Sequence, residues 1–156
     1  MLPIKIHISC TQLPRTAESL DNLLSRISCS AIANREITLI HGSDWDGQIN
    51  EHGLNINYFN CGYDTQSLYE FPALSKMRQD GIDEDYYGLY LHVKGASKTD
   101  EQQWQNALAW QDYMMQCLVD RAETCIQHLQ RGADYVGSQW HWHWKGNFFW
   151  HRSQYT

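Results

Sequence analysis

The sequence lacks several features that define common functional classes. It has no run of clustered Lys and Arg, and its formal net charge is −6, whereas nucleic-acid binding needs grouped basic side chains. It has no apolar stretch of about 18 residues, the length that a membrane-spanning helix requires. Its start, Met1 to Lys5, lacks the charged and then apolar pattern of a signal peptide. We therefore expect a cytoplasmic protein that binds no nucleic acid and spans no membrane.

Recognisable metal and disulfide patterns are also missing. The five cysteines are scattered without a C-x-x-C pair, which predicts reduced and mostly buried thiols. His141 and His143 have a spacing that could bind zinc, but no third ligand lies nearby in the sequence. We therefore predict no metal site. The 156 residues contain no linker, internal repeat or low-complexity segment, which favours one domain over residues 1–156.

The hydrophobic pattern predicts strands that alternate with helices. The expected strands cover residues 4–8, 36–41, 54–59, 86–93 and 133–138, with further apolar segments at 140–144 and 147–150. The expected helices cover residues 16–27, about 72–79 and about 101–130, with an acidic loop at 81–85. We expect Thr16 to cap the first helix and Gly132 to end the last. This order predicts an α/β domain whose mostly parallel sheet has helices on both faces and a ligand site at its carboxyl edge.

A first polar motif, Y-L-H-V-K-G at residues 90–95, ends the most apolar of these strands. In a strand His92 and Lys94 point to one face, and Leu91 and Val93 point to the other. Lys94 can meet a diphosphate as a point charge, and His92 can donate to an oxyanion or carry a proton near neutral pH. The alternative is a solvated strand end, with the Lys side chain lying along the surface.

A second motif, H-W-K-G-N-F-F-W, covers residues 143–150. Gly146 would allow a close approach of the backbone to a ligand, and Asn147 offers donors and acceptors that suit sugar hydroxyls. Four of the seven Trp residues fall between positions 140 and 150. They could build a stacking platform for a ligand, or they could pack a buried edge strand.

Together the two motifs resemble the L-H-x-K-G and H-x-x-G-N-F-W-W elements of glycosyltransferase-like proteins with a glycosyltransferase-A type fold. The resemblance is strongest over residues 69–98 and 134–155. It implies transfer of a sugar from a nucleotide-sugar donor to a glycan or other acceptor. It implies that His92, Lys94 and His143 are catalytic. It also implies that the sugar or acceptor is faced by Glu70, Trp144, Gly146 and Asn147.

The same resemblance covers the loops after the first two strands. Residues 41–47 resemble a D-D-G-S-x-D-G turn, although His41 stands where an acidic residue is expected. The resemblance implies that the nucleotide is bound by Ser9, Thr11, Arg15, Gly42 and Asp44. For each of these residues the alternative is an ordinary turn or helix start. For Glu70 the alternative is a helix N-terminus, where the dipole favours a negative charge.

Many glycosyltransferases of this type carry an Asp-x-Asp metal motif after the central strand, where this chain has His92-Val93-Lys94. We therefore expect Lys94 to neutralise the charge that develops on the departing phosphate. A requirement for Mn²⁺ or Mg²⁺ stays open. Asp44-Trp45-Asp46 is an Asp-x-Asp sequence in a different loop, where a turn is the favoured interpretation over a cation site.

Other functions stay open at this point. The chain could be a sugar- or nucleotide-binding module without turnover, a metal hydrolase using His141 and His143, or an interaction protein with a Trp-rich patch. Related domains continue beyond the second motif, whereas this chain ends at Thr156. We therefore expect a minimal transferase, an inactive relative, or a subunit completed by a partner. Self-association through the long helix is also open.

Overall fold

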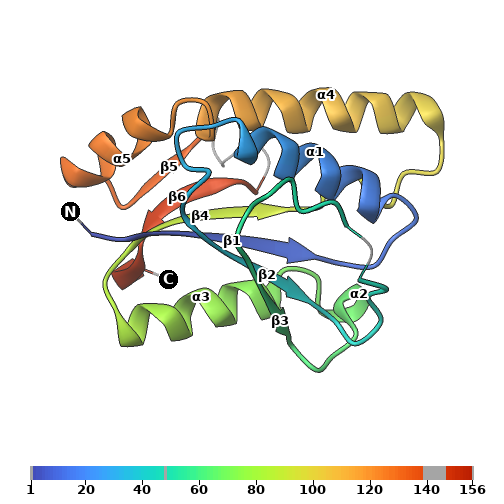
Figure 1. The fold of residues 1–156 in the computed structure, drawn as a ribbon, viewed down its shortest axis with the longest axis horizontal. Coiled ribbons are helices and arrows are strands. Elements are labelled where there is room, and N and C mark those ends of the chain that lie inside the picture. Colours follow the sequence, from blue (N-terminus) through green and yellow to red (C-terminus); the bar gives the residue numbers. More distant parts are fainter. Residues whose placement is uncertain (1, 48, 139–146, 156) are drawn as a thin grey trace.

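The computed structural model describes residues 2–47, 49–138 and 147–155, which form one α/β domain around a six-stranded sheet (Figure 1). The strands are β1 (Ile4–Cys10), β2 (Glu36–His41), β3 (Ile56–Asn60), β4 (Tyr87–His92), β5 (Tyr135–Gly137) and β6 (Phe149–Arg152). Their order across the sheet is β3-β2-β1-β4-β6-β5. The first four are parallel, and β6 runs antiparallel to both β4 and β5. The predicted mostly parallel sheet is confirmed.

Helices cover both faces of this sheet, as the sequence predicts (Figure 1). They are α1 (Thr16–Ser28), α2 (Thr65–Leu68), α3 (Phe71–Asp83), α4 (Glu101–Leu118) and α5 (Ala122–Gln130), followed by the 3-10 turn η1 (Ser153–Tyr155). The helices α1, α4 and α5 lie on one face and α3 lies on the other, while α2 lies near the end of β1. No helix in the described part of the chain is long and apolar enough to cross a membrane.

The two faces of the central strands have different chemistry. Ile6 and Ile8 of β1 and Leu91 of β4 belong to the large core under α1, α4 and α5. On the α3 face, β4 instead contributes Tyr90 to a small core, and His7 of β1 bonds to Asp80 of α3. This alternation follows from the two-residue period of a strand. It places the polar side chains of β1 and β4 beneath α3.

The chain changes direction across the sheet between β1 and β4. From β1 the strands proceed outward to β2 and β3, and the connection through α3 then returns the chain to the other side of β1. Open α/β sheets bind their ligands outside the carboxyl ends of the strands at such a switch point. The topology therefore favours a ligand site at the carboxyl ends of β1 and β4.

The predicted helix over residues 101–130 is wrong, because α4 ends at Leu118 and α5 begins at Ala122. In a continuous helix the Leu118 carbonyl would accept the Ala122 N–H. It accepts the indole N–H of Trp150 at 2.8 Å instead, and the Ala122 N–H bonds to Val119. A long-range bond from β6 therefore replaces one bond of the helix.

Two further expectations need correction. Gly81 to Asp83 belong to α3 and not to a loop. Gly81 suits this place because a Cβ there would lie 2.9 Å from the Ser153 carbonyl of η1. Thr16 is the first residue of α1 and does not cap it, because its hydroxyl donates to the Thr11 carbonyl at 2.6 Å and accepts the N–H of Leu13 at 2.9 Å. Thr16 therefore fixes the loop that follows β1.

The predicted end of the last helix is confirmed. Gly132 follows α5 with a φ of 103°, a left-handed conformation that glycine adopts readily. The last two strands are shorter or shifted relative to the expected segments, with β5 at residues 135–137 and β6 at 149–152. The apolar segment expected at 140–144 lies outside the described residues.

Candidate functional site

A pocket of about 350 Å³ lies at the carboxyl ends of β1 and β4, at the switch point of the sheet. Its lining combines residues from the ends of both strands with residues from α2 and from the turn before α3. The lining residues are Ser9, Thr11, Leu13, Gln66, Tyr69, Glu70, His92, Val93 and Ser97. We call this cavity the switch-point pocket.

His92 is the last residue of β4 and reaches this pocket from the α3 face. Its side chain is 14% exposed. Burial, together with the positive charge of Lys94, lowers the pKa of His92 to about 3. The imidazole is therefore neutral at physiological pH, which favours a hydrogen-bonding role over the proton-carrier role expected near neutral pH. Its Nε2 makes no hydrogen bond to the described residues.

Glu70 lies beside His92 and connects two parts of the chain that are distant in sequence. Its Oε1 is 3.6 Å from Nε2 of His92 and accepts a hydrogen bond of 2.8 Å from Nδ2 of Asn147. Glu70 also occupies the N-cap position of α3, although its side chain makes no capping bond. Glu70 thus sits at a helix N-terminus and also lines the pocket, and its role toward a sugar or acceptor stays a prediction.

Tyr69, next to Glu70, has a strained backbone. Its φ is 50° and its ψ is −117°, and its side chain is 73% exposed. A residue other than glycine in such a conformation costs about 1–3 kcal/mol, and such residues gather at functional sites. The sequence gives no sign of this strain, because it arises from the turn that joins α2 to α3.

Two buried polar atoms near the same end of the sheet also lack partners. Oε1 of Gln12 and Oγ1 of Thr65 make no hydrogen bond to the described residues. Their segments are connected, because Gln66 donates from Nε2 to the Gln12 carbonyl at 2.8 Å. Buried polar atoms are nearly always hydrogen-bonded in native proteins. Neither residue lines the switch-point pocket, although each is next in sequence to a residue that does.

Lys94 follows His92 on the same side of the chain but does not line the pocket. Its charge acts on the pKa of His92, so the two side chains lie near each other. Lys94 forms no salt bridge with the residues that the structure describes. The charge of Lys94, near His92, is therefore not neutralised by those residues.

The loop after β2 forms the expected turn. The N–H of Trp45 bonds to the Gly42 carbonyl at 3.4 Å, and the N–H of Ser43 bonds to the Tyr63 carbonyl at 3.2 Å. A Cβ on Gly42 would lie 2.6 Å from that same carbonyl, so glycine is needed for close packing here.

Burial, with the charges of Asp44 and Asp46, raises the pKa of the Cys10 thiol to about 12. Asp44 therefore lies close to the end of β1, although neither it nor Gly42 lines the pocket.

The guanidinium of Arg15 contacts two carboxylates and an indole ring. Its guanidinium bonds to Glu101 at 2.8 Å and to Glu18 at 3.3 Å, and it lies over the ring of Trp104. Its backbone N–H bonds to the Ala96 carbonyl at 3.0 Å. Arg15 thus ties the loop after β1 to the segment after β4, and its role in nucleotide binding stays a prediction.

The structure therefore brings Ser9, Thr11, Glu70 and His92 together in one pocket, with Asn147 attached through Glu70. His143, Trp144 and Gly146 lie outside the described residues, as does His141. Among the residues that are described, no group of three His, Cys, Asp or Glu side chains is placed to hold a metal ion.

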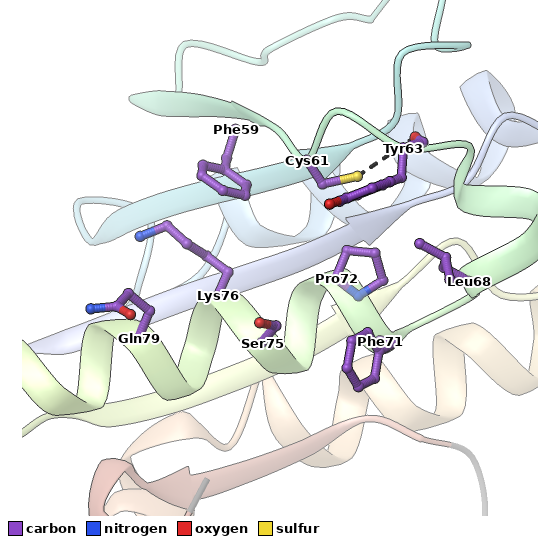
Figure 2. Close-up of a pocket in the computed structure, with 9 residues that line it drawn as sticks. All are labelled: Phe59, Cys61, Tyr63, Leu68, Phe71, Pro72, Ser75, Lys76 and Gln79. Carbon is purple, nitrogen blue, oxygen red and sulfur yellow. Dashed lines mark hydrogen bonds between the residues drawn. The ribbon is translucent and has the colours of Figure 1, made fainter.

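A second cavity of about 620 Å³ lies between the end of β3 and the side of α3 that faces it (Figure 2). Rings line one part of it, while polar side chains of α3 line another. The lining residues are Phe59, Cys61, Tyr63, Leu68, Phe71, Pro72, Ser75, Lys76 and Gln79. Sequence patterns do not group these residues, because they come from β3, α2, α3 and the loop after β3. Leu68 and Phe71 line this cavity, whereas Tyr69 and Glu70 between them line the switch-point pocket.

Comparison with known proteins identifies no family. No protein-family model, curated protein or solved structure matches the chain. The geometry of the switch-point pocket therefore carries the functional argument. Its main features are a neutral His92, a carboxylate at Glu70 and a nearby cation, Lys94, without a salt bridge to the described residues.

Proposed function

We propose that the switch-point pocket binds a nucleotide-sugar donor and that the protein is a glycosyltransferase with a glycosyltransferase-A type fold. The observation that carries this proposal is the convergence on Glu70 of His92 from the first motif and Asn147 from the second. The two motifs are far apart in sequence, and the resemblance to the family depends on both. Their meeting at the edge where α/β sheets bind ligands supports a shared chemical role.

A positive charge near His92 of the pocket suits a diphosphate leaving group. Lys94 supplies a positive charge, while the neutral imidazole of His92 can donate one hydrogen bond without adding charge. Preorganised donors and cations aimed at the developing negative charge are a major source of catalytic rate. In this proposal Lys94 performs the task that a divalent cation performs in many related enzymes.

The reaction would proceed as follows. The acceptor hydroxyl oxygen forms a bond to the anomeric carbon of the donor sugar, and the bond from that carbon to the diphosphate oxygen breaks. The nucleoside diphosphate leaves with the bonding electron pair. Glu70 takes the proton of the acceptor hydroxyl as a general base, and Asn147 orients its carboxylate.

The proposal is tested by calorimetric titration with UDP, GDP and CDP, each with and without Mn²⁺. We expect one nucleotide to bind without metal, and Lys94→Ala to weaken this binding by about tenfold or more, as the loss of a charge-assisted contact implies. Lys98→Ala is the control, because Lys98 is an exposed lysine four residues away. Absence of binding by all three nucleotides would refute the donor site.

The size of the pocket favours one alternative, a binding module without turnover. A volume of about 350 Å³ lies near the lower limit for ligand sites. It suits part of one nucleotide better than a donor and an acceptor together. Release of nucleoside diphosphate from UDP- and GDP-sugars separates the two functions. A transferase releases it faster when acceptor is present, whereas a binding module releases none.

A further inference from the structure

The second cavity, which we call the β3–α3 cavity, has two walls of different chemistry (Figure 2). One wall continues a face of β3, and its residues recur at every second position, as side chains on one face of an extended segment do. They are Phe59, Cys61 and Tyr63. The other wall is one face of α3, with the three- and four-residue spacing of a helix. It consists of Pro72, Ser75, Lys76 and Gln79. Rings on the β3 side thus lie opposite polar side chains of α3.

The charge of this cavity is balanced within the protein. Lys76 is the charged residue of its lining, and its ammonium bonds to Asp80 and lies 5.4 Å from the centre of the Phe59 ring. Burial raises the pKa of Asp80, but hydrogen bonds from His7 and Lys76 outweigh burial and lower this pKa to about 2. Burial also lowers the pKa of His7, so its imidazole is neutral. Because Lys76 and Asp80 cancel each other's charge, the cavity favours an uncharged ligand.

The exposure of the rings limits which uncharged ligands fit. Tyr63 is 65% exposed and Phe71 is 69% exposed, so a ligand that packs on them keeps one side in water. An alkyl chain gains most when all its sides leave water, which this open wall does not allow. A sugar ring has an apolar C–H face for an aromatic ring and hydroxyls that can remain hydrated. The hydroxyl of Ser75 and the amide of Gln79 offer donors and acceptors to those hydroxyls.

The turn before α3 places this cavity next to the switch-point pocket. Leu68 and Phe71 line the β3–α3 cavity, and Tyr69 and Glu70 between them line the switch-point pocket. A ligand that packs on Phe71 therefore lies beside the residue that we propose as the general base. The volume of about 620 Å³ lies in the middle of the range for small-molecule sites. The two cavities together therefore offer room for two ligands.

We propose that the β3–α3 cavity binds a neutral sugar, which packs its apolar face on the rings of Tyr63 and Phe71 and bonds through its hydroxyls to the polar face of α3. Within the transferase function proposed above, on which this assignment rests, the sugar belongs to the acceptor. Its reacting hydroxyl then approaches Glu70 from the side of Phe71, while the donor occupies the switch-point pocket.

Saturation-transfer difference NMR of the full chain tests this without nucleotide. The probes are the methyl glycosides of glucose, galactose, mannose and N-acetylglucosamine. We expect at least one to bind the wild type, and Phe71→Ala to weaken this binding by about fivefold, as the loss of an aromatic contact implies. Ile82→Ala is the matched control, since Ile82 is 70% exposed on α3 but does not line the cavity. It should leave the affinity unchanged.

A second variant separates loss of the contact from damage to the fold. Gln79→Ala, an exposed change within α3, keeps a good helix former and should weaken the same sugar a few-fold. Circular dichroism verifies that each variant is folded. An affinity that is unchanged in both Phe71→Ala and Gln79→Ala would place the sugar elsewhere and overturn the proposal.

The choice of probes distinguishes the class of ligand. Absence of binding by all four glycosides overturns the proposal. Binding of octyl glucoside without binding of methyl glucoside would show a site for an alkyl chain, which also overturns it. A stronger affinity for methyl glucuronide than for methyl glucoside would contradict the neutral charge of the site.

Calorimetric titration of the same variants with nucleotide separates this proposal from the donor site. Phe71→Ala should leave nucleotide affinity within about twofold, because Phe71 does not line the switch-point pocket. Sugar binding that is lost in Phe71→Ala while no nucleotide binds the wild type would support the sugar cavity and refute the transferase. Nucleotide binding without sugar binding would support the donor site and overturn the sugar cavity.

Discussion

Asn147 donates a 2.8 Å hydrogen bond from Nδ2 to Oε1 of Glu70, and this bond joins the segment before β6 to the residue before α3. The two residues are 77 positions apart. The contact matters because the same carboxylate oxygen lies 3.6 Å from Nε2 of His92. One carboxylate thus connects three elements at the edge of the switch-point pocket, and several predictions depend on it.

Replacing Glu70 by Gln should separate catalysis from binding. Gln keeps an oxygen that can accept the Asn147 N–H, but it removes the base. We expect turnover to fall by about 10²-fold or more, the usual contribution of a general base, while nucleotide affinity stays within a few-fold. Steady-state kinetics and calorimetry measure the two effects. Glu123→Gln, an exposed change on α5, is the control. Unchanged turnover in Glu70→Gln would exclude Glu70 as the base.

Replacing Asn147 by Asp should create a pH-dependent defect. Two carboxylates within hydrogen-bond distance cannot both be ionised without repulsion, so the pair keeps a shared proton to a higher pH than an isolated carboxyl would. We expect Asn147→Asp to be less stable than wild type at pH 8 and to approach it as the pH falls toward 5. Urea unfolding across this range measures the difference. A constant difference at every pH would show that the hydrogen bond does not persist in solution.

The sequence predicts the inner strands well, because their apolar runs reflect burial on both faces. It also places Ser9 and His92 at the same edge, since parallel strands end on the same side. The meeting of Glu70 and Asn147 could not be predicted in this way. It depends on the antiparallel pairing of β6 with β4, which residue periodicity does not encode. The break between α4 and α5 has a similar origin, because the Trp150 indole that replaces a helical bond comes from β6.

Acid should destabilise the fold through buried histidines. Burial lowers the pKa of His92 to about 3, and burial with the proximity of His7 lowers that of His151 to about 4. In the unfolded chain both pKa values return to about 6.5, so below that pH the unfolded state binds more protons. Stability is therefore full above pH 6.5 and falls as the pH drops toward 4.

The size of this loss of stability follows from the lowered pKa values of the two histidines. Between pH 6.5 and pH 5 each histidine that stays neutral in the fold contributes a loss of about 2 kcal/mol. Urea unfolding of the wild type should give a lower free energy of unfolding at pH 5 than at pH 7. His92→Gln should reduce the pH dependence, whereas the exposed change His128→Gln should not. Equal pH dependence in all three proteins would contradict the assignment.

The packing of His151 against Gly88 gives the last prediction. The two residues are register partners in β6 and β4, and the imidazole covers the place where a side chain at Gly88 would lie. A Cβ on Gly88 would clash with Nε2 of His151, whose side chain is fully buried. We expect Gly88→Ala to destabilise the protein by about 1–3 kcal/mol, as overpacking of a core does.

A double variant distinguishes this clash from a general intolerance of alanine in β4. His151→Ala removes the ring and leaves a cavity, which should itself be destabilising. In Gly88→Ala/His151→Ala the added methyl occupies part of that cavity. The two losses should therefore be less than additive, by about 0.5 kcal/mol or more, as for residues in contact. Additive losses in thermal unfolding would mean that the ring of His151 does not lie over Gly88 in solution.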